Sequence, residues 1–369
     1  MKTKKEKDVK SWFHLTAEKT FVGLLILVII LSLLNIAQVN GLFIPKQPQV
    51  MIEGNTISLH SLTLDQKIAQ MLIVQGNINN LDPLKNLQVG GLHFFARESE
   101  EIFKQQIDLF QAGMRIPFFV TVDLEGCVSP FIYFRNFTPA AEINTIEEAY
   151  DKGVEEGQFL QGIGVNLNFA PVVDLDDQIW KCRSFPGDER HISDLAQAYI
   201  KGLQKNNILA TAKHYPGKTL VVRDPHKFIV NARIDSRDIF PYDYLAEIGE
   251  VKAVMVSHII TDGAINSGTV PSVVSRKVLD DLKKKYPGLI ISDEIHMLGL
   301  KNFYNSLDEM YVAVFKAGND LVLNFDSDAN EIYHMIQVVK EAVQSGEIWI
   351  EDIDRSVTKV LEAKGFKVV

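Results

Sequence analysis

Two pairs of polar residues stand close together in the segment "KHYPGKTLVVRDPHKF". Lys213 and His214 close an apolar run, and Asp224 and His226 follow with one residue between them. An imidazole has a pKa of about 6.5, and a neighbouring carboxylate orients its ring and favours its protonated form. Asp224 and His226 could therefore form a dyad that protonates a leaving oxygen and later deprotonates a water molecule. The alternative is a solvated loop in which Asp-Pro starts a turn.

Asp293 directly follows the apolar residues and the serine of "LIISDEIHMLG". A carboxylate held at the end of a strand, in a partly dry opening, is suited to nucleophilic attack on an anomeric carbon. The alternative is structural, because Ser292 or Asp293 could cap the helix expected to follow. The residues alone leave both interpretations open.

Other polar residues near the ends of apolar runs are suited to binding hydroxyl groups: Asp123, Arg183, Lys213 and His214. Buried Lys and Asp are rare unless they are paired, so these residues indicate a ligand site. His258, after "AVMVS", is a further candidate for substrate binding. It could equally be a hydrogen-bonded histidine of the core.

Cysteine content and net charge exclude several classes of function. The two cysteines, Cys127 and Cys182, allow at most one disulfide, which an oxidising compartment would permit without requiring it. Neither belongs to a CxxC motif, so a structural zinc site is not expected. The sequence contains no GxxxxGK[ST] or GxGxxG motif. A net charge of −9, from 38 basic and 47 acidic residues, argues against general nucleic-acid binding.

The elements that must position these residues repeat along the chain from residue 60 onward. Short apolar, β-branched runs alternate with amphipathic stretches, which is typical of βα units. The runs cover residues 71–74, 90–96, 117–123, 165–174, 208–214, 253–259, 288–294 and 320–325. Eight such units predict an α/β fold of the (β/α)8 TIM-barrel type. Polar residues stand at or just past the carboxyl ends of the runs, which meet on the active face of such a barrel: Arg97, Asp123, Asp174, Lys213, His214, His258 and Asp293. Asp224 and His226 lie on the long stretch after His214.

The first forty residues have a different composition. Basic residues at positions 2, 4, 5, 7 and 10 precede an uncharged apolar stretch at 20–37, long enough to cross a membrane. We expect a cytoplasmic basic segment (1–19), a transmembrane anchor or signal (20–37), a linker (38–58) and a barrel (59–369). An uncleaved anchor is favoured, because no small-residue cleavage pattern follows. The basic flank then places the barrel on the extracytoplasmic side, or the protein is secreted if the stretch is cleaved. We expect a monomer.

Several motifs together resemble glycoside hydrolase family 3, in its single-domain β-N-acetylglucosaminidase branch. The resemblance covers about residues 62–330. "GGLHFFAR" is similar to the family's Gly-Gly-x-x-x-Phe-x-Arg, "VDLEG" to Asp-x-Glu-Gly, and "VNLNFAPVVD" to Asn-x-Asn-Phe-Ala-Pro-Val-x-Asp. Later along the chain, "RSFPGD", "AKHYPG" and "SDEIHMLG" resemble Arg-Ser-Phe-Gly-x-Asp, Lys-His-Phe-Pro-Gly and Ser-Asp-x-x-x-Met-x-Gly.

The resemblance implies a retaining exo-glycosidase that needs no metal or organic cofactor. Asp293 would be the nucleophile, with His226 as acid/base and Asp224 as its partner. The substrate would be an N-acetylglucosamine-containing glycan such as a peptidoglycan fragment, held by the four hydroxyl-binding residues above. The Asp-x-His pair distinguishes this branch from the two-domain β-glucosidases of the family.

Two segments depart from the family pattern. Lys218 to Val221 replace His-Gly-Asp-Thr, and Cys127 and Val128 stand where the family has Gly and Arg. These changes motivate a second hypothesis, a catalytically impaired barrel that binds sugars or a partner. A β-glucosidase-type exo-glycosidase is a third hypothesis, which the Asp-x-His pair disfavours.

Overall fold

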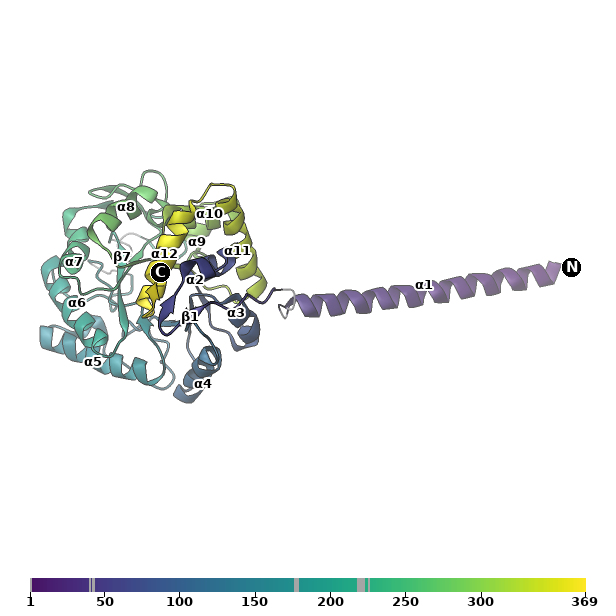
Figure 1. Ribbon diagram of the computed structural model, residues 1–369, viewed down its shortest axis with the longest axis horizontal. Coiled ribbons are helices and arrows are strands. Elements are labelled where there is room, and N and C mark those ends of the chain that lie inside the picture. Colours follow the sequence, from purple (N-terminus) through teal and green to yellow (C-terminus); the bar gives the residue numbers. More distant parts are fainter. Residues whose placement is uncertain (1, 40, 42–43, 176–178, 218–222, 225) are drawn as a thin grey trace. The chain divides into compact units, whose positions relative to one another are not determined.

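A computed structural model describes residues 2–39, 41, 44–175, 179–217, 223–224 and 226–369. The chain divides into two compact units, Met1–Pro45 and Lys46–Val369. The first unit consists mainly of helix α1 (Lys2–Val39) (Figure 1). Within α1, the 19 residues Lys19–Ala37 are long and apolar enough to cross a membrane. This helix is a candidate membrane span, and a signal sequence would have the same length and composition.

Eight parallel strands form the central sheet of the second unit. Around the sheet they follow chain order: β3 (Leu72–Gln75), β4 (Gly91–His93), β5 (Phe119–Val122), β6 (Leu167–Asn168), β7 (Leu209–Tyr215), β9 (Ala253–Val256), β11 (Leu289–Ser292) and β12 (Val322–Asn324). β12 pairs with β3, and a parallel bridge between Ile291 and Leu321 links β11 to β12. The ring of strands is thereby closed. The prediction of a (β/α)8 barrel is confirmed.

Helices cover the outside of the barrel and connect successive strands (Figure 1). Three of them begin with a capping box, in which the side chain at the N-cap and the side chain three residues later bind each other's backbone N–H; the N-caps are Thr63, Thr145 and Asp235. The α-helices are α2 (Leu64–Gln70), α3 (Leu81–Leu87), α4 (Glu100–Gln111), α5 (Ile146–Gly162), α6 (Glu189–Gln204), α7 (Ser236–Glu247), α8 (Arg276–Lys285), α9 (Leu298–Lys301), α10 (Leu307–Ala317), α11 (Ala329–Gln344) and α12 (Ile350–Ala363). Single 3₁₀ turns are η1 (Leu59–Ser61), η2 (Ile78–Asn80), η3 (Ala140–Glu142) and η4 (Ser272–Val274).

Inward-facing apolar side chains fill the barrel. They include Ile73, Phe119, Leu167, Met255 and Ile291, all at most 2% exposed. Burial of large apolar side chains is the main favourable contribution to folding, at about 1.5–3 kcal/mol for each. This packed interior holds the strand ends at fixed positions, so that residues just beyond them are placed precisely relative to one another.

Two small sheets lie outside the barrel wall. β1 (Ile52–Glu53), β2 (Thr56–Ile57) and β13 (Lys367–Val368) form one. β8 (Asn231–Ile234) and β10 (Ile260–Gly263) form the other, a parallel pair whose apolar residues pack in a separate cluster. Because β8 follows β7 and β10 follows β9, this second pair joins the connections that follow two barrel strands.

The fourth apolar run differs from its expected form. The sequence predicted a strand over 165–174, whereas β6 ends at Asn168. Pro171 lies in the middle of this run and has no N–H to donate to a strand ladder. Beyond the proline, contact with β7 continues through single bonds, such as Val173 N–H to the Lys213 carbonyl at 2.9 Å.

Candidate functional site

A cavity of about 170 Å³ opens where the carboxyl ends of the barrel strands meet. Six of the eight residues proposed from the sequence line it: Asp123, Arg183, Lys213, His214, His226 and Asp293. The other lining residues are Glu125, Val128, Phe169, Trp180, Met255, Glu294, Met297, Leu323 and Phe325. The cavity thus has charged walls above an apolar floor of aromatic and aliphatic side chains.

Three larger hollows lack this concentration of reactive groups. The smallest of them, of about 240 Å³, lies beside Lys85 and Arg115, and its described lining contains no carboxylate or imidazole. Two are larger still. One, of about 510 Å³, lies at the starts of strands, beside Phe119 and Leu209, and its described lining contains no carboxylate or imidazole. The other, of about 710 Å³, is an open surface hollow beside Arg97 and Tyr133. Acid/base chemistry therefore points to the smaller cavity.

Buried charges form one wall of the cavity. The Lys213 ammonium lies 2.6 Å from Asp123 Oδ1 and also pairs with Glu125, which is only 5% exposed. Burial opposes the charged forms of these groups, but their mutual attraction is stronger. The pKa of Asp123 is consequently lowered to about 2, and the pKa of Lys213 is raised. Both side chains are charged at neutral pH.

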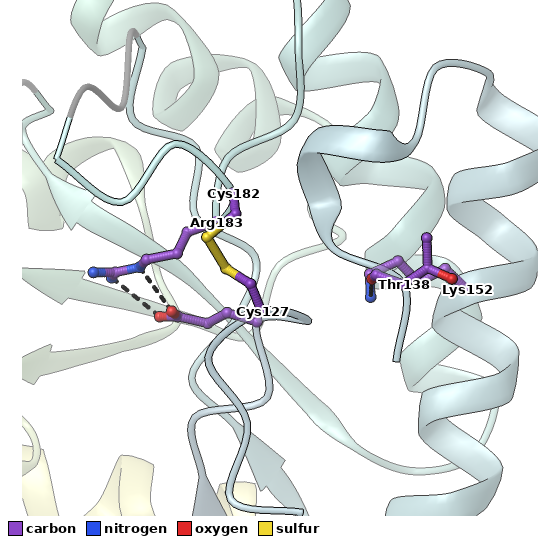
Figure 2. The surroundings of a disulfide bond; sticks show 6 residues. Cys127, Thr138, Lys152, Cys182 and Arg183 are labelled. Atoms are coloured by element: carbon purple, nitrogen blue, oxygen red, sulfur yellow. Dashed lines mark hydrogen bonds and ion pairs between the residues drawn. A yellow bond between two sulfur atoms is a disulfide. The ribbon is translucent and has the colours of Figure 1, made fainter. Parts of the chain in front are cut away.

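Arg183 extends this wall from the segment that follows β6. Its Nε lies 2.7 Å from Glu125 Oε2, and its Nη2 donates to Glu125 Oε1 at 3.1 Å (Figure 2). Such a two-point contact fixes a guanidinium in orientation as well as position. Nη2 also lies 3.3 Å from His214 Nε2. Glu125 therefore organises both cations, Lys213 and Arg183, that face the cavity.

His214 is held rigidly by a buried carboxylate. Its Nδ1 lies 2.7 Å from Asp174 Oδ2, and its backbone N–H donates to Asp174 Oδ1 at 3.1 Å. The Tyr242 hydroxyl donates to the same Oδ1 at 3.4 Å. Contact with the carboxylate at Nδ1 leaves Nε2 as the ring nitrogen directed toward Arg183 and the cavity.

Asp293 lies just beyond β11 and is 7% exposed. Its backbone N–H donates to the Val256 carbonyl at 3.0 Å, and its Oδ1 accepts the N–H of Glu294 at 2.8 Å. Burial alone would raise its pKa, but the nearby imidazoles of His258, His214 and His226 and this hydrogen bond lower it overall. Asp293 is thus ionised at neutral pH, as a nucleophilic carboxylate must be.

The capping alternative for this segment does not hold. The next helix, α9, begins at Leu298, with Met297 at its N-cap and no side-chain capping bond. The Ser292 hydroxyl instead accepts the backbone N–H of Leu323 at 2.9 Å and so links β11 to β12. Neither Ser292 nor Asp293 caps a helix.

Asp224 and His226 form a hydrogen-bonded pair. His226 Nδ1 lies 2.6 Å from Asp224 Oδ1, and the backbone N–H of His226 donates to the same oxygen at 3.0 Å. Burial acts to raise the pKa of Asp224, but these contacts with His226 lower it overall. Asp224 is not among the described lining residues of the cavity, and it contacts His226 at Nδ1. The N–H of Lys227 donates to the Asp224 carbonyl at 3.1 Å.

Two contacts hold His226 over the cavity. Its backbone carbonyl accepts the N–H of Leu298 at 3.0 Å, which links the segment after β7 to the start of α9. Its ring lies edge-to-face against Trp180, with the ring centres 6.4 Å apart. The imidazole is nonetheless 41% exposed and accessible to a substrate.

His258 lies behind the cavity and is not among its described lining residues. It is 2% exposed, and its Nε2 lies 2.7 Å from the Glu294 carbonyl oxygen. Burial lowers its pKa. This position fits a hydrogen-bonded core histidine better than a residue that touches a sugar.

Several lining residues had not been singled out from the sequence. Glu125 stood in a recognised motif, but nothing local indicated that it would pair with two cations. Trp180 belongs to a segment with no periodicity. The floor residues Phe169 and Phe325 were indistinguishable from core, and they sandwich the His93 ring at centre distances of 5.6 and 4.2 Å.

Among the residues that the structure describes, no group of three or more His, Cys, Asp or Glu side chains could hold a metal ion. The substitutions at Lys218–Val221, and Pro225 between the dyad residues, lie outside the described residues.

Cys127 and Cys182 form a disulfide, with Cα atoms 6.0 Å apart. The sequence had left open whether the two cysteines pair.

The family model for the glycosyl hydrolase family 3 N-terminal domain matches residues 63–363. The chain belongs to this family. The expectation of a glycoside hydrolase is thereby confirmed. The β-hexosaminidase LpqI of Mycobacterium tuberculosis is 26% identical over 324 residues, which cover 81% of this chain and 82% of that protein. A β-hexosaminidase of Methylobacillus flagellatus is 30% identical over 259 residues, covering 64% of this chain and 73% of the relative.

Solved structures of family 3 proteins share the fold. The structure of M. tuberculosis LpqI superposes with a TM-score of 0.77 at 24% identity, covering 88% of this chain and 99% of that one. A family 3 glycosyl hydrolase from Mycobacterium smegmatis gives a TM-score of 0.75 at 26% identity, covering 83% and 98%. Both matches cover nearly the whole of the compared chains, so this glycosyl hydrolase shares its single-barrel architecture with them.

Proposed function

We propose that this protein is a retaining, exo-acting β-N-acetylhexosaminidase that releases terminal N-acetylglucosamine from glycans. The observation that carries the proposal is that Asp293, just beyond β11, and His226, on the connection between β7 and β8, line the same small cavity. Ligand pockets typically measure about 300–1,000 Å³, so a cavity of about 170 Å³ suits one sugar ring rather than a chain. The names of the relatives agree with this activity.

The charged wall would bind the non-reducing sugar. Asp123 would accept hydrogen bonds from sugar hydroxyls, and Lys213 and Arg183 would donate to them. His214, held by Asp174, adds a ring nitrogen on the same side. Because these groups are already oriented by one another, little side-chain freedom is lost when the sugar binds.

Hydrolysis would proceed in two steps through a covalent intermediate. First, a carboxylate oxygen of Asp293 attacks the anomeric carbon while His226 donates a proton to the glycosidic oxygen, which leaves as the alcohol. Second, neutral His226 removes a proton from a water molecule that attacks the same carbon and releases Asp293. Asp224 would favour the protonated imidazole in the first step and keep the ring oriented in both.

The N-terminal helix and the disulfide support an extracytoplasmic location. Lysines flank the amino end of the candidate span, and basic flanks remain in the cytoplasm. Disulfides persist in oxidising compartments, which supports a position of the barrel outside the cytoplasm. A membrane-anchored enzyme at this position would reach peptidoglycan fragments, which contain N-acetylglucosamine.

His258 would act indirectly in catalysis. Its contact with the Glu294 carbonyl would hold the backbone beside Asp293.

The proposal is tested with full-length protein in mild detergent and a panel of nitrophenyl glycosides. The panel contains N-acetyl-β-glucosaminide, N-acetyl-β-galactosaminide, β-glucoside and β-xyloside, each with wild-type protein and with Asp293→Asn. Preferential turnover of the N-acetylglucosaminide that the substitution abolishes supports the proposal. Preferential turnover of the β-glucoside favours the hypothesis of a β-glucosidase-type exo-glycosidase. Binding of N-acetylglucosamine without turnover of any glycoside means that the barrel is a binding module.

A further inference from the structure

The Cys127–Cys182 disulfide joins the segment after β5 to the segment after β6 (Figure 2). Cys127 is exposed and Cys182 is half-buried, so a small reductant in solution can reach the bond. Its two ends flank the buried ion pair of the cavity wall. Glu125 stands two residues before Cys127, and Arg183 directly follows Cys182.

Apart from the disulfide itself, the backbone beside Cys127 and the backbone beside Cys182 have different contacts with the rest of the barrel. On the Cys127 side, Gly126 has φ +93°, and a Cβ there would come within 2.6 Å of Pro139 Cα, so this backbone packs tightly against the chain. The N–H of Glu125 also donates to the Val128 carbonyl at 2.9 Å. On the Cys182 side, the N–H of Ala141 donates to the Cys182 carbonyl at a longer 3.3 Å, and a single parallel bridge joins Ser184 to Val172.

The segment carrying Cys182 also carries two residues of the cavity. Arg183 stands well beyond the end of β6 at Asn168, on a connection rather than on a barrel strand. Trp180 stands two residues before Cys182, lines the cavity and contacts the His226 ring edge-on. The guanidinium of Arg183 lies 5.8 Å from the centre of the Trp180 ring. Because connections are generally more mobile than strands, these two side chains need an additional restraint.

Exact placement of Arg183 matters because its partner is buried. Glu125 and Arg183 are 5% and 6% exposed, and a buried carboxylate that loses a partner is strongly disfavoured. Displacement of Arg183 would also alter the surroundings of Lys213, which pairs with the same carboxylate. The disulfide thus lies where a small movement would disturb the whole charged wall.

We propose that the Cys127–Cys182 disulfide is a positioning element of the sugar-binding wall, and that its reduction weakens sugar binding. The inference rests on the proposed function. Reduction by a dithiol transfers two electrons and two protons to the disulfide, giving two thiols, while the dithiol becomes a cyclic disulfide. The segment with Trp180 and Arg183 then loses its covalent link to the tightly packed segment with Glu125.

The experiment compares full-length protein before and after treatment with dithiothreitol, well below the melting temperature of the reduced form. Thiol titration checks that reduction is complete, and far-UV circular dichroism checks that the fold is retained. We expect KM for the nitrophenyl N-acetylglucosaminide, and the inhibition constant of free N-acetylglucosamine, to rise about tenfold, with kcat changed less. A Cys127→Ser/Cys182→Ser variant should reproduce these values and should not respond to dithiothreitol.

Tryptophan fluorescence gives a second measurement, of the surroundings of Trp180. A change in the overall stability of the protein would not by itself alter this emission. The chain has three tryptophans, and we expect reduction to change the emission of Trp180. Trp349 is 67% exposed and does not line the described cavity, so the change should persist in the Trp349→Phe variant. The change should disappear in the Trp180→Phe variant.

Three results would overturn the inference: free thiols in protein that was never reduced, unchanged KM and inhibition constant after complete reduction, or a loss of activity that occurs only together with loss of fold. If the oxidised protein hydrolyses no glycoside, the proposed function fails, and calorimetric binding of N-acetylglucosamine before and after reduction still tests the disulfide. If the double variant does not fold, reduced wild-type protein decides the outcome.

Discussion

His226 Nδ1 lies 2.6 Å from Oδ1 of Asp224, two residues earlier in the sequence, and the same oxygen accepts the backbone N–H of His226. With Nδ1 committed to the carboxylate, Nε2 is the nitrogen left to exchange a proton with a substrate. The pair therefore resembles the base and its orienting group in other hydrolases.

His226→Ala should slow hydrolysis most for substrates with poor leaving groups. A nitrophenolate leaves with little protonation, whereas the hydroxyl of a second sugar requires a proton. We expect a loss of about 10²–10⁴-fold on a disaccharide and a much smaller loss in the first step on a dinitrophenyl glycoside. Because the second step also needs a base, the glycosyl-enzyme should accumulate and be detectable as a mass increase on Asp293. Equal losses on both substrates would exclude His226 as the acid.

Asp293→Asn should lower kcat by about 10³-fold or more, since an amide oxygen does not replace a carboxylate as nucleophile. Asp262→Asn is a matched control, because Asp262 is a 66% exposed carboxylate on β10 that forms a 3.7 Å surface pair with Arg233. The control should retain wild-type kinetics. Full activity in a correctly folded Asp293→Asn protein would remove Asp293 from the mechanism.

Sequence patterns predicted the barrel and most of the cavity because both depend on local signals. Apolar runs gave the strands, and polar residues at their carboxyl ends had to converge once the strands closed into a ring. The runs ending near Asp123, Lys213 and Asp293 illustrate this. The chemistry proposed for these residues remains a prediction.

Features that depend on contacts between connections could not be predicted. Nothing local to Cys127 or Cys182 indicated that these two residues, 55 positions apart in the sequence, would come together. The contact between Trp180 and His226 could not be predicted for the same reason, because the two residues belong to different connections. Loop positions of this kind depend on tertiary packing, which leaves no periodic trace in the sequence.

Glu125→Gln should weaken both sugar binding and folding. The substitution leaves Arg183 and Lys213 with one carboxylate fewer in a buried wall, and breaking such a pair costs about 3–5 kcal/mol. Glu155→Gln is the matched control, since Glu155 is 58% exposed and its 3.1 Å pair with Arg135 should contribute about 1 kcal/mol or less. Kinetics and chemical denaturation of both variants test this. Equal effects of the two substitutions would contradict the role assigned to Glu125.

Glu294→Gln should stabilise the protein at alkaline pH. Burial raises the pKa of Glu294 to about 7, although the backbone N–H groups of His296 and Phe325 donate to its Oε1 at 3.0 and 3.2 Å. Since the folded pKa lies above the unfolded value, the protonated side chain contributes stability at low pH, and that contribution is lost as pH rises toward 7. Glutamine imitates the protonated acid and keeps an oxygen for both N–H groups, so it avoids the loss.

The free energy of unfolding of Glu294→Gln, relative to wild type, should therefore increase by about 2–3 kcal/mol between pH 5 and pH 8. Denaturant titrations at several pH values measure this difference. Glu341→Gln, at an exposed position of α11, should show no such trend. A difference that stays constant with pH would mean that Glu294 is already ionised throughout this range, and that its two N–H contacts offset its burial completely.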